Sequence, residues 1–481
     1  AATVEIGEGL LSRLRGVCAE VDAGDQSRAE AARDWWPLAI HWAKAGQVPA
    51  LPSAVARPAD AAQVAGVLRL CNEARVPVTP MAGRSGVCGG SLPVFGGLAL
   101  DLCALSGILE VDDDSLLVDV AAGTFGTDLE DGVRAGHGLT IGHWPQSVAI
   151  STVGGWLACR SAGQYSTRYG KIEDIVAGVE VVLADGRAVE TGGRAPRAAV
   201  GPDLTQAFVG SEGTLGVITR ARLRAHPVPQ AEERAAWAFP SFGAGLEACR
   251  RTLRRDATPA VLRLHDAAEA ARRFGAAEPA LLIALDEGDR ALVGPAMGVL
   301  AEECRAEGGR PLDDELVGRW LATRNDVADL GALAAKGIVV DTVEVAARWS
   351  ALLDLYRAGV DGLAAVEGTL GASAHQSHAY PGGACLYFTF AGRPADGTGD
   401  PAWAEAYYRR AWGAVMAATL AAGGAISHHH GIGLNRGPWL PEGLGAGFGV
   451  LQSLKAALDP AGILNPGKLG LASPFGAPPW P

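Results

Sequence analysis

Residues 145–170 read PQSVAISTVGGWLACRSAGQYSTRYG, a stretch rich in glycine and hydroxyl side chains. Ser151 and Thr152 are both suitable N-caps for a helix through the following VGGW, because a side-chain oxygen there satisfies a free backbone N–H. From Gly142 to Ile218 the glycine and hydroxyl content stays high while strand and helix patterns alternate. The pattern predicts a mixed α and β unit with many turns.

Two downstream segments extend this unit. Residues 179–190 read VEVVLADGRAVE and predict a β-hairpin, because Asp-Gly is a preferred two-residue turn. Residues 210–218 read GSEGTLGVI, in which a glycine-rich turn leads into a strand.

Upstream lies a second glycine-rich loop. Asp60 to Arg75 has helical spacing, Val76 to Pro80 predicts a strand, and residues 81–90 read MAGRSGVCGG. The next regular segment, residues 97–102, looks like a strand, whereas nucleotide loops of the Rossmann and P-loop types open directly into a helix. The loop therefore fits neither motif. It is either a cradle for a diphosphate or a surface turn.

The second half of the chain has a different pattern. Glycine thins out after residues 226–229, which read HPVP, and strands and helices alternate from Trp237 to Arg305. A compact α+β sandwich fits this order best. We expect three parts: residues 1–228, residues 229–425, and a C-terminal segment over residues 426–481.

Bulk properties exclude several classes of protein. The net charge of −12 argues against nucleic acid and anionic membranes as partners, because both require a positive surface. The eight cysteines are scattered without zinc-ligand spacing, which predicts free thiols in a reducing cytoplasm. The first residues lack the apolar core of a signal peptide. We expect a cytoplasmic protein without integral membrane contact.

At the level of motifs, the chain resembles a known family. The stretch from Pro145 to Gly170, the segment GSEGTLGVIT and the ending LDPAGILNPGKL are similar to the FAD-linked oxidases of the vanillyl-alcohol-oxidase/PCMH superfamily. Residues 427–433, SHHHGIG, and residues 383–390, GACLYFTF, most resemble the alkyldihydroxyacetonephosphate synthase branch. The resemblance implies an α+β fold: a two-part PCMH-type FAD-binding domain with an α+β, ferredoxin-like substrate cap domain.

The resemblance also implies FAD as the cofactor and makes residues 81–90 its diphosphate loop. Small residues there would let the backbone approach the flavin, and hydroxyl and N–H groups would satisfy its polar edges. The positions carried over are Pro80, Gly83, Arg84, Ser85, Gly86, Cys88, Gly89, Pro145, Ser147, Ser151, Thr152, Gly154, Gly155, Ser161, Gly163, Glu212, Gly213, Gly216, Val217 and Ile218.

Cys88 stands near the position at which some branches attach FAD covalently through a histidine. A cysteinyl bond to the flavin is one alternative. A small side chain packed against the cofactor is the other, and we expect non-covalent FAD.

Two catalytic candidates follow from the resemblance. Tyr387 lies on the opposite face of its strand from Leu386 and Phe388, and it matches the catalytic tyrosine of the family; nearby cations would activate its phenol. Arg324, in LATRNDVADL, matches an arginine that binds the anionic group of the substrate. The alternatives are a structural hydrogen bond for the tyrosine and a surface ion pair to Asp326 or Asp329 for the arginine.

The three consecutive histidines, His428, His429 and His430, complete the catalytic set. In metal-dependent relatives a glutamate occupies the position of His429, and upstream histidines such as His375 and His378 join it around a cation. No acidic residue lies between positions 425 and 433, so we expect no metal and a proton-handling role. If the loop is extended, His428 and His430 share one side and His429 faces away.

Two chemistries fit these residues. One is oxidation of a small anionic alcohol or 2-hydroxy acid by FAD, which we favour. The other is a synthase-like reaction in which the fatty acid of an acylated dihydroxyacetone phosphate is exchanged for a long-chain alcohol without net redox change. A flavin-binding scaffold without turnover is a third reading, and a homodimer is possible in each case.

Overall fold

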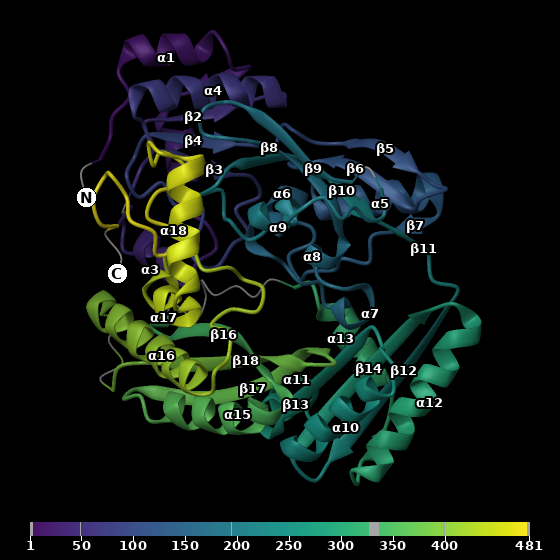
Figure 1. The fold of residues 1–481 in the computed structure, drawn as a ribbon. Helices are drawn as coiled ribbons and strands as arrows, with labels where there is room; N and C mark the ends of the chain where they lie inside the picture. Colours follow the sequence, from purple (N-terminus) through teal and green to yellow (C-terminus); the bar gives the residue numbers. More distant parts are fainter. Residues whose placement is uncertain are drawn as a thin grey trace.

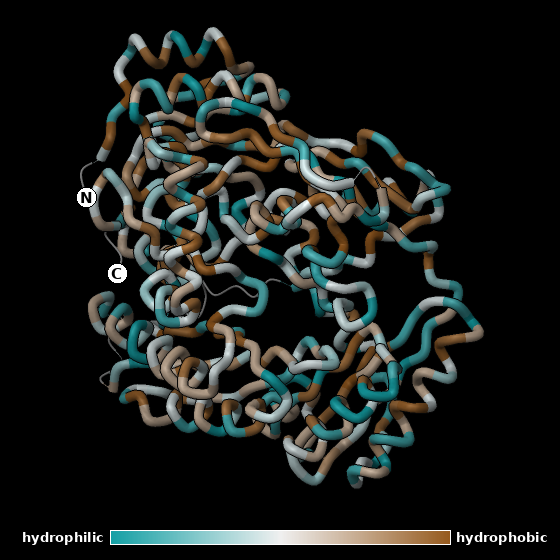
Figure 2. Tube along the Cα trace, in the orientation of Figure 1, coloured by the Kyte–Doolittle hydropathy of each residue, from teal (hydrophilic) through white to brown (hydrophobic). Residues whose placement is uncertain are grey.

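The computed structural model describes residues 3–48, 50–193, 195–326, 336–395, 397 and 400–478. Three sheets of four, five and seven strands, with a two-stranded ribbon, form its framework. Figure 1 shows the first two sheets above the seven-stranded sheet, with the C-terminal helix alongside them. Hydrophobic residues concentrate along the strands, and hydrophilic residues along the outer loops (Figure 2). The predicted α+β class is confirmed.

The four-stranded sheet holds the glycine-rich loop. Strands β3 and β4 pair with each other in parallel orientation, and the loop of residues 81–90 begins at the end of β3 and leads toward β4. The predicted helix at residues 60–75 is confirmed, because the Asp60 carboxylate accepts a hydrogen bond from the backbone N–H of Gln63 and caps it. The strands, in sheet order, are β1 (Glu20–Asp22), β2 (Ala54–Arg57), β4 (Leu98–Asp101) and β3 (Val78–Met81), and the helices are α1 (Glu8–Arg15), α2 (Asp25–Glu30), α3 (Pro37–Lys44) and α4 (Ala61–Ala74).

The five-stranded antiparallel sheet includes the predicted hairpin, since β8 and β9 pair around the Asp185-Gly186 turn. Its strands, in sheet order, are β5 (Ile108–Asp112), β6 (Leu117–Ala121), β10 (Val217–Arg224), β8 (Val176–Val182) and β9 (Ala188–Gly192). The ribbon pairs β7 (Leu139–Thr140) with β11 (His226–Pro227), and the helices are α5 (Gly126–His137), α6 (Val153–Cys159), α7 (Ser166–Tyr169), α8 (Ile172–Ile175) and α9 (Leu204–Phe208).

The seven-stranded sheet spans residues 231–392, and four long helices cover one of its faces. Its strands, in sheet order, are β15 (Arg310–Leu312), β12 (Ala231–Phe239), β14 (Ala280–Gly288), β13 (Val261–Asp266), β17 (Thr369–Tyr380), β18 (Gly383–Gly392) and β16 (Val339–Arg348). The covering helices are α10 (Phe242–Arg254), α12 (Arg290–Ala306), α15 (Trp349–Ala364) and α16 (Pro401–Ala421), and two further helices of this part are α11 (Ala267–Phe274) and α13 (Glu315–Thr323).

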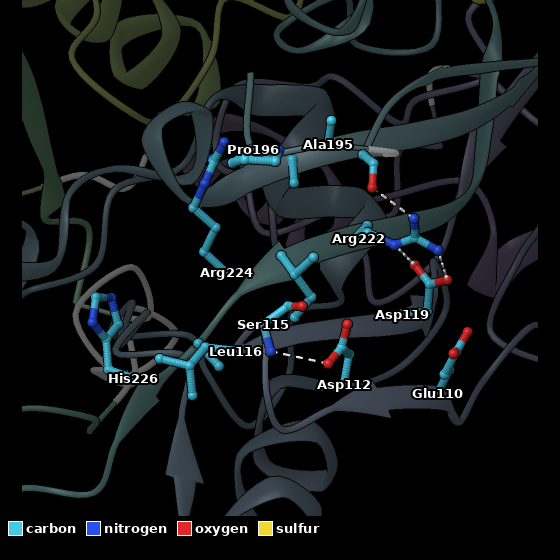
Figure 3. A pocket seen from close by; sticks show the side chains of 14 residues that line it. Glu110, Asp112, Ser115, Leu116, Asp119, Ala195, Pro196, Arg222, Arg224 and His226 are labelled. Atoms are coloured by element: carbon cyan, nitrogen blue, oxygen red, sulfur yellow. Dashed lines mark hydrogen bonds and ion pairs between the residues drawn. The ribbon is translucent and has the colours of Figure 1, made fainter. Parts of the chain in front are cut away.

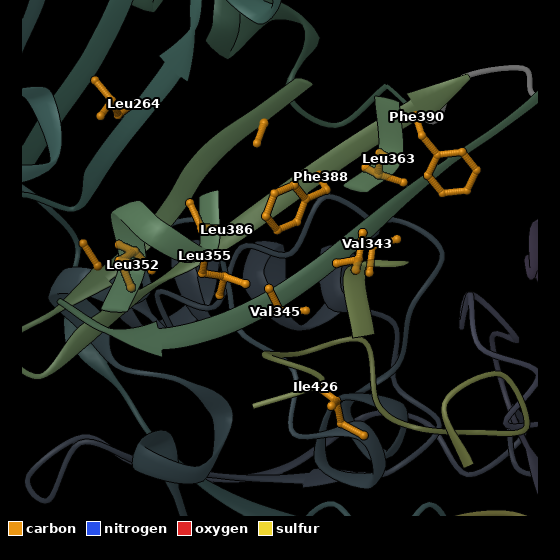
Figure 4. Packing of buried hydrophobic residues seen from close by; sticks show 14 of the residues in the cluster. Leu264, Val343, Val345, Leu352, Leu355, Leu363, Leu386, Phe388, Phe390 and Ile426 are labelled. Carbon is orange, nitrogen blue, oxygen red and sulfur yellow. The ribbon is translucent and has the colours of Figure 1, made fainter. Parts of the chain in front are cut away.

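The two faces of this sheet differ in chemistry. Leu386, Phe388 and Phe390 of β18 are fully buried and belong to the hydrophobic cluster that includes Leu352 and Leu355 of α15 (Figure 4). The residue between the first two, Tyr387, therefore points to the other face, as the alternation of the strand predicts.

Strand register places a row of polar residues on that other face. Tyr387 pairs directly with Glu344 of β16 and with His375 of β17, and His375 pairs with His265 of β13. Directly opposed residues share a face of a sheet, so four strands present one continuous polar row.

The C-terminal segment returns to the first two sheets. It contains the 3-10 helix η1 (Gly437–Trp439), α17 (Leu440–Leu444) and α18 (Gly447–Leu458). Lys455 of α18 is buried, and its Nζ donates to the backbone oxygens of Thr214 and Leu464, each at 2.8 Å, and to the Asp459 carboxylate. One ammonium group thus joins the returning helix to the GSEGTLG segment. The three-part division of the chain stays a prediction.

A search of the described helices for one long and apolar enough to cross a membrane finds no candidate.

We predict that Lys455→Met lowers the free energy of unfolding by about 3–5 kcal/mol, because it leaves the Asp459 carboxylate buried without its cation. Denaturant unfolding followed by tryptophan fluorescence measures this. The exposed Lys336→Met is the control and should change stability by less than about 0.5 kcal/mol. Equal values for the two variants would contradict the account.

Candidate functional site

The loop of residues 81–90, called the glycine loop below, presents unpaired backbone donors. Within the described part of the chain, the N–H groups of residues 83–87 have no hydrogen-bond acceptor. Arg84 has a positive φ of 53°, and its guanidinium is turned away to the Glu30 carbonyl at 2.9 Å. Consecutive free N–H groups in a turn form an anion-binding concavity, which suits a diphosphate.

Close backbone contacts explain several glycines of the predicted set. A Cβ on Gly83 would lie 2.3 Å from the backbone oxygen of Ile150, and one on Gly163 would lie 2.5 Å from the backbone nitrogen of Trp144. A Cβ on Gly216 would lie 2.4 Å from the Val181 side chain. Gly83 and Gly163 thus allow close approach to the backbone of other segments, and Gly216 allows close approach to a side chain.

The hydroxyls of the opening stretch serve the protein itself. Ser151 Oγ donates to the Ser147 carbonyl at 2.8 Å and accepts from Trp156 Nε1 at 2.7 Å. Thr152 caps α6 through the N–H of Gly155. The Ser151 hydroxyl is therefore bonded on both sides within the protein, and its contact with the flavin stays a prediction.

Glu212 connects the cofactor segment to the C-terminal return. It has a positive φ of 49°, and its buried carboxylate accepts from the backbone N–H groups of Ile432 at 2.6 Å and Gly433 at 2.8 Å. Burial raises its pKa above the ordinary value. The Cys88 carbonyl accepts from the N–H groups of Leu434 and Asn435, so the glycine loop is bound to the same return.

The structure brings predicted cofactor positions from three segments together, because Gly83 lies against Ile150, which precedes Ser151, and Gly213 lies against Pro80. Val217 and Ile218 differ, because both are buried in β10 and pair with Val182 and Val181 of β8. Their side chains serve the core, which leaves backbone contact as their route to a cofactor.

Cys88 is buried, and burial raises the pKa of its thiol far above the ordinary value. A neutral, enclosed thiol is a poor nucleophile. This environment supports the predicted non-covalent cofactor.

The three histidines and Tyr387 form a hydrogen-bonded cluster. Tyr387 Oη lies 2.8 Å from Nε2 of both His429 and His430. His429 Nδ1 lies 2.8 Å from His428 Nδ1. Burial lowers the pKa of His428 and His429 to about 3 and that of His430 to about 4, so all three are neutral near pH 7.

The extended conformation considered for residues 427–433, called the histidine loop below, is wrong. His429 and His430 turn toward the same hydroxyl because Glu344 curls the backbone. One buried carboxylate accepts from the N–H groups of His428, His429 and His430 and from Ser427 Oγ. Four donors can converge on one carboxylate only if the chain bends around it.

Arg436 balances the charge of Glu344. Its Nη1 lies 2.8 Å from Glu344 Oε1, and both side chains are completely buried. Burial alone would raise the pKa of Glu344, but Arg436 and the neighbouring histidines hold it below its ordinary value. The carboxylate is therefore ionised.

The expectation that nearby cations activate the Tyr387 phenol is corrected by its pKa. Burial and then the Glu344 carboxylate raise it well above the ordinary value, and the nearby Arg263 and Arg436 do not outweigh them. Cations alone do not activate this phenol. The oxygen can take up another proton only as its own proton moves to a neighbour.

A second cluster lies along the same polar row. His375 stacks on Tyr387 with ring centroids 5.1 Å apart, and its Nε2 lies 2.8 Å from a guanidinium nitrogen of Arg263. Its Nδ1 lies 3.1 Å from the fully buried Glu269 carboxylate, which also faces His265. Arginine only donates, so His375 Nε2 accepts and Nδ1 carries the proton.

Arg324 lies between the two halves of the structure. Its guanidinium lies 4.8 Å from the Tyr165 ring and 5.8 Å from the Trp320 ring, and it donates to Gln164 Oε1 at 3.2 Å. Within the described residues no acid pairs with it, which disfavours the surface ion pair to Asp326; Asp329 lies outside the described residues. Arg263 lies 5.5 Å from the same Trp320 ring. The guanidinium groups of Arg263 and Arg324 therefore both lie against the Trp320 ring.

Sequence reasoning missed Glu344, Arg436 and Arg263. Arg263 is the single charged residue of AVLRLH, and Glu344 is one of two acidic residues, with Asp341, in the otherwise apolar VVDTVEVAA. A charge in such a position is rare unless it is paired or functional, which was the available signal.

Potential metal ligands form three groups within the described residues: His378 with His428 and His429, His265 with Glu269 and His375, and Glu344 with Cys385 and His429. His375 therefore does not join His378 as the sequence suggested. Both nitrogens of His429 already contact neighbours, and His378 Nδ1 lies 2.9 Å from Ser166 Oγ. The absence of a metal stays a prediction.

A cavity of about 710 Å³ lies elsewhere, along β5, β6 and β10 (Figure 3). Its described lining contains none of the predicted site residues. Arg222 there is paired with Asp119 and donates to the Gly193 carbonyl, and Arg224 donates to backbone carbonyls. The charge of Arg222 is thus neutralised by Asp119, and the guanidinium of Arg224 is held by backbone carbonyls.

Comparison with known proteins places this site in a family. A model described as the FAD binding domain matches residues 52–192, and one described as the C-terminal domain of FAD linked oxidases matches residues 228–469. The chain belongs to the FAD-linked oxidase family. It is therefore an FAD-dependent enzyme, which excludes the scaffold without turnover.

Individual relatives span the whole chain. Glycolate oxidase subunit GlcD of Bacillus subtilis (strain 168) is 30% identical over 447 residues, covering 88% of this chain and 90% of that protein. Alkyldihydroxyacetonephosphate synthase of Trypanosoma brucei brucei is 29% identical over 480 residues, covering 92% and 76% respectively.

Solved structures confirm the two-part PCMH-type fold. An alkyldihydroxyacetonephosphate synthase superposes with a TM-score of 0.80 at 24% identity, covering 97% of this chain and 87% of that chain. p-Cresol methylhydroxylase with substrate bound superposes with a TM-score of 0.79 at 18% identity, covering 98% and 99%.

We predict that denaturation with acid releases all of the FAD into the supernatant, since the Cys88 thiol is buried and protonated. Absorbance of the supernatant measures this, and Cys88→Ser should retain the same flavin content. Flavin that stays with the precipitated wild-type protein but not with the variant would show a covalent bond.

We predict that Gly83→Ala loses most of its bound flavin during gel filtration, because the new Cβ forces the glycine loop away from Ile150. The flavin-to-protein absorbance ratio measures this. Gly382→Ala is a matched control, because a Cβ there meets nothing within 4 Å. Full flavin retention by Gly83→Ala would remove the glycine loop from the site.

Proposed function

We propose that the protein oxidises a small anionic alcohol, with 2-hydroxy acids as the substrate class. One observation carries the proposal: a half-buried tyrosine hydroxyl is connected through His375 to two arginines that lie against one tryptophan ring. Arg263 contacts the ring that stacks on Tyr387, and Arg324 shares Trp320 with Arg263. Oxidation of a 2-hydroxy acid removes a proton from a hydroxyl next to a carboxylate. The reaction therefore needs a proton acceptor together with cations that bind the carboxylate.

Each group has a separate task. The arginines bind the carboxylate, since a guanidinium presents parallel N–H donors to two oxygens. Burial lowers the pKa of Arg263 to about 10, which still leaves it charged. Tyr387 takes the hydroxyl proton. The glycine loop and the segments around Gly163 and Glu212 would hold FAD, which would supply the two-electron acceptor.

The named relatives support this class. The Bacillus subtilis relative is called a glycolate oxidase subunit, and glycolate is the smallest 2-hydroxy acid. Its match covers 88% of this chain and 90% of that protein.

A synthase-like alkyl transfer is the second candidate. It is favoured by the histidine loop, in which His429 stands where a metal-dependent oxidase would have a carboxylate, and by the relative named alkyldihydroxyacetonephosphate synthase. In this reaction the arginines would bind a phosphate, and Tyr387 would again accept a proton.

Location and assembly are part of the same proposal. A cytoplasmic enzyme fits the eight cysteines, which are all free in the structure. A homodimer, with no nucleic acid and no integral membrane partner, completes the proposal.

We predict that anaerobic mixing with a panel of 2-hydroxy acids bleaches the flavin absorbance, and that Tyr387→Phe slows this by about 10²- to 10⁴-fold with flavin retained. Stopped-flow absorbance measures the rate. Tyr407→Phe, which removes a buried hydroxyl in α16, is the control and should react at the wild-type rate.

If every hydroxy acid leaves the flavin oxidised, the oxidase proposal is wrong. Product formation from an acylated dihydroxyacetone phosphate and a long-chain alcohol would then establish the second candidate.

A further inference from the structure

We propose that the Glu344 carboxylate fixes the proton positions of the histidine loop so that Tyr387 accepts, rather than donates, a proton at the substrate. Glu344 is thus a positioning residue that acts through His430. The inference deepens the proposed function and rests on it for the identity of the proton donor, while the proton positions themselves are a property of the protein alone.

The starting state of the cluster has one proton on each ring. The three histidines are neutral, since burial lowers the pKa of each, and Tyr387 is a phenol. A neutral imidazole has one N–H and one bare nitrogen, and a phenol has one O–H. The question is therefore which nitrogen of each ring carries the proton.

Glu344 decides this at His430. The Nδ1 atom of His430 lies 3.6 Å from Glu344 Oε1, and within the described residues it has no hydrogen-bond partner. A proton on Nδ1 is attracted by the carboxylate, whereas a lone pair there is repelled. Arg436 donates to the same carboxylate oxygen and keeps it ionised. Nε2 of His430 is therefore the bare, accepting nitrogen.

The remaining protons follow from this choice. Tyr387 Oη has a single proton, which it donates to His430 Nε2 at 2.8 Å. At the 2.8 Å contact with His429 Nε2 it must then accept, so His429 carries its proton on Nε2. His429 Nδ1 is bare and accepts from His428 Nδ1 at 2.8 Å.

This polarity makes Tyr387 a proton acceptor. Its oxygen has two lone pairs, of which His429 occupies one, so the other is presented to the substrate. When the oxygen takes the substrate proton, its own proton moves to His430 Nε2. The tyrosine stays neutral and His430 becomes a cation facing the Glu344 carboxylate. If both histidines donated instead, Tyr387 would present its proton to the substrate.

Other charged groups around the cluster do not reverse this assignment. Arg436 is directed at Glu344, Arg263 donates to His375, and Lys171 lies over the Tyr380 ring at 4.6 Å. Glu269 faces His375 and His265 on the far side of Tyr387. Glu344 is the acid that faces His430 among the described residues.

Long-range ¹H–¹⁵N correlation spectra of ¹⁵N-histidine-labelled, flavin-loaded protein test the assignment directly. We expect His428 and His430 with the proton on Nδ1 and His429 with the proton on Nε2. Single His→Gln variants assign the signals. His375, whose tautomer is set by Arg263, is an internal reference with its proton on Nδ1.

Two variants distinguish whether Glu344 or Tyr387 sets the tautomer of His430. In Glu344→Gln the His430 proton should move to Nε2, and flavin reduction should slow at least about 10-fold. In Tyr387→Phe the His430 proton should stay on Nδ1, because Glu344 is intact. A wild-type His430 protonated on Nε2, or a His430 that changes tautomer in Tyr387→Phe, would overturn the proposal even if Glu344→Gln does not fold.

Failure of the proposed function gives a different result. If no hydroxy acid bleaches the flavin while the three tautomers are as expected, the substrate class is wrong and the role of Glu344 stands. If the hydroxy acids react but His430 carries its proton on Nε2, only the present inference is wrong.

Discussion

The site depends on two buried carboxylates that bind the two ends of the histidine loop. Glu344, on the seven-stranded sheet, receives the N–H groups at the start of the loop, and Glu212, beside the cofactor segment, receives those of Ile432 and Gly433 at its end. Each carboxylate is buried, so leaving it without these donors would carry a large desolvation cost. The loop therefore has one conformation available, and the catalytic groups inherit their positions from it.

The register of the sheet is the second constraint. Tyr387 meets the loop because β18 pairs with β16 and β17 so that Glu344, Tyr387 and His375 stand side by side. A slip of one residue would place Leu386 or Phe388 on the polar face and send Tyr387 into the helix-covered core. The hydrophobic face, with Phe388 and Phe390 fully buried, holds the register that the chemistry requires.

The sequence predicted what local patterns determine. Alternation along β18 placed Tyr387 on the correct face, and the Asp60 cap identified α4. The sequence also excluded the Rossmann and P-loop motifs for the glycine loop, but it left a diphosphate cradle and a surface turn open. It did not predict the curled histidine loop, because that shape is set by Glu344, 84 residues away from His428. Arg263 was missed for a similar reason: a lone arginine in a strand has no meaning until its cross-strand neighbours are known.

The two carboxylate contacts also determine when the site can exist during folding. The hydrogen bond from Ile432 to Glu212 closes a sequence separation of 220 residues, and it joins the last part of the chain to the first half. Contacts of such long range form late, since the entropy of closing the loop must be offset by structure already present. A nascent or truncated chain that has folded the four-, five- and seven-stranded sheets still lacks its histidine loop. The enzyme therefore gains its reactive centre only when the final segment docks.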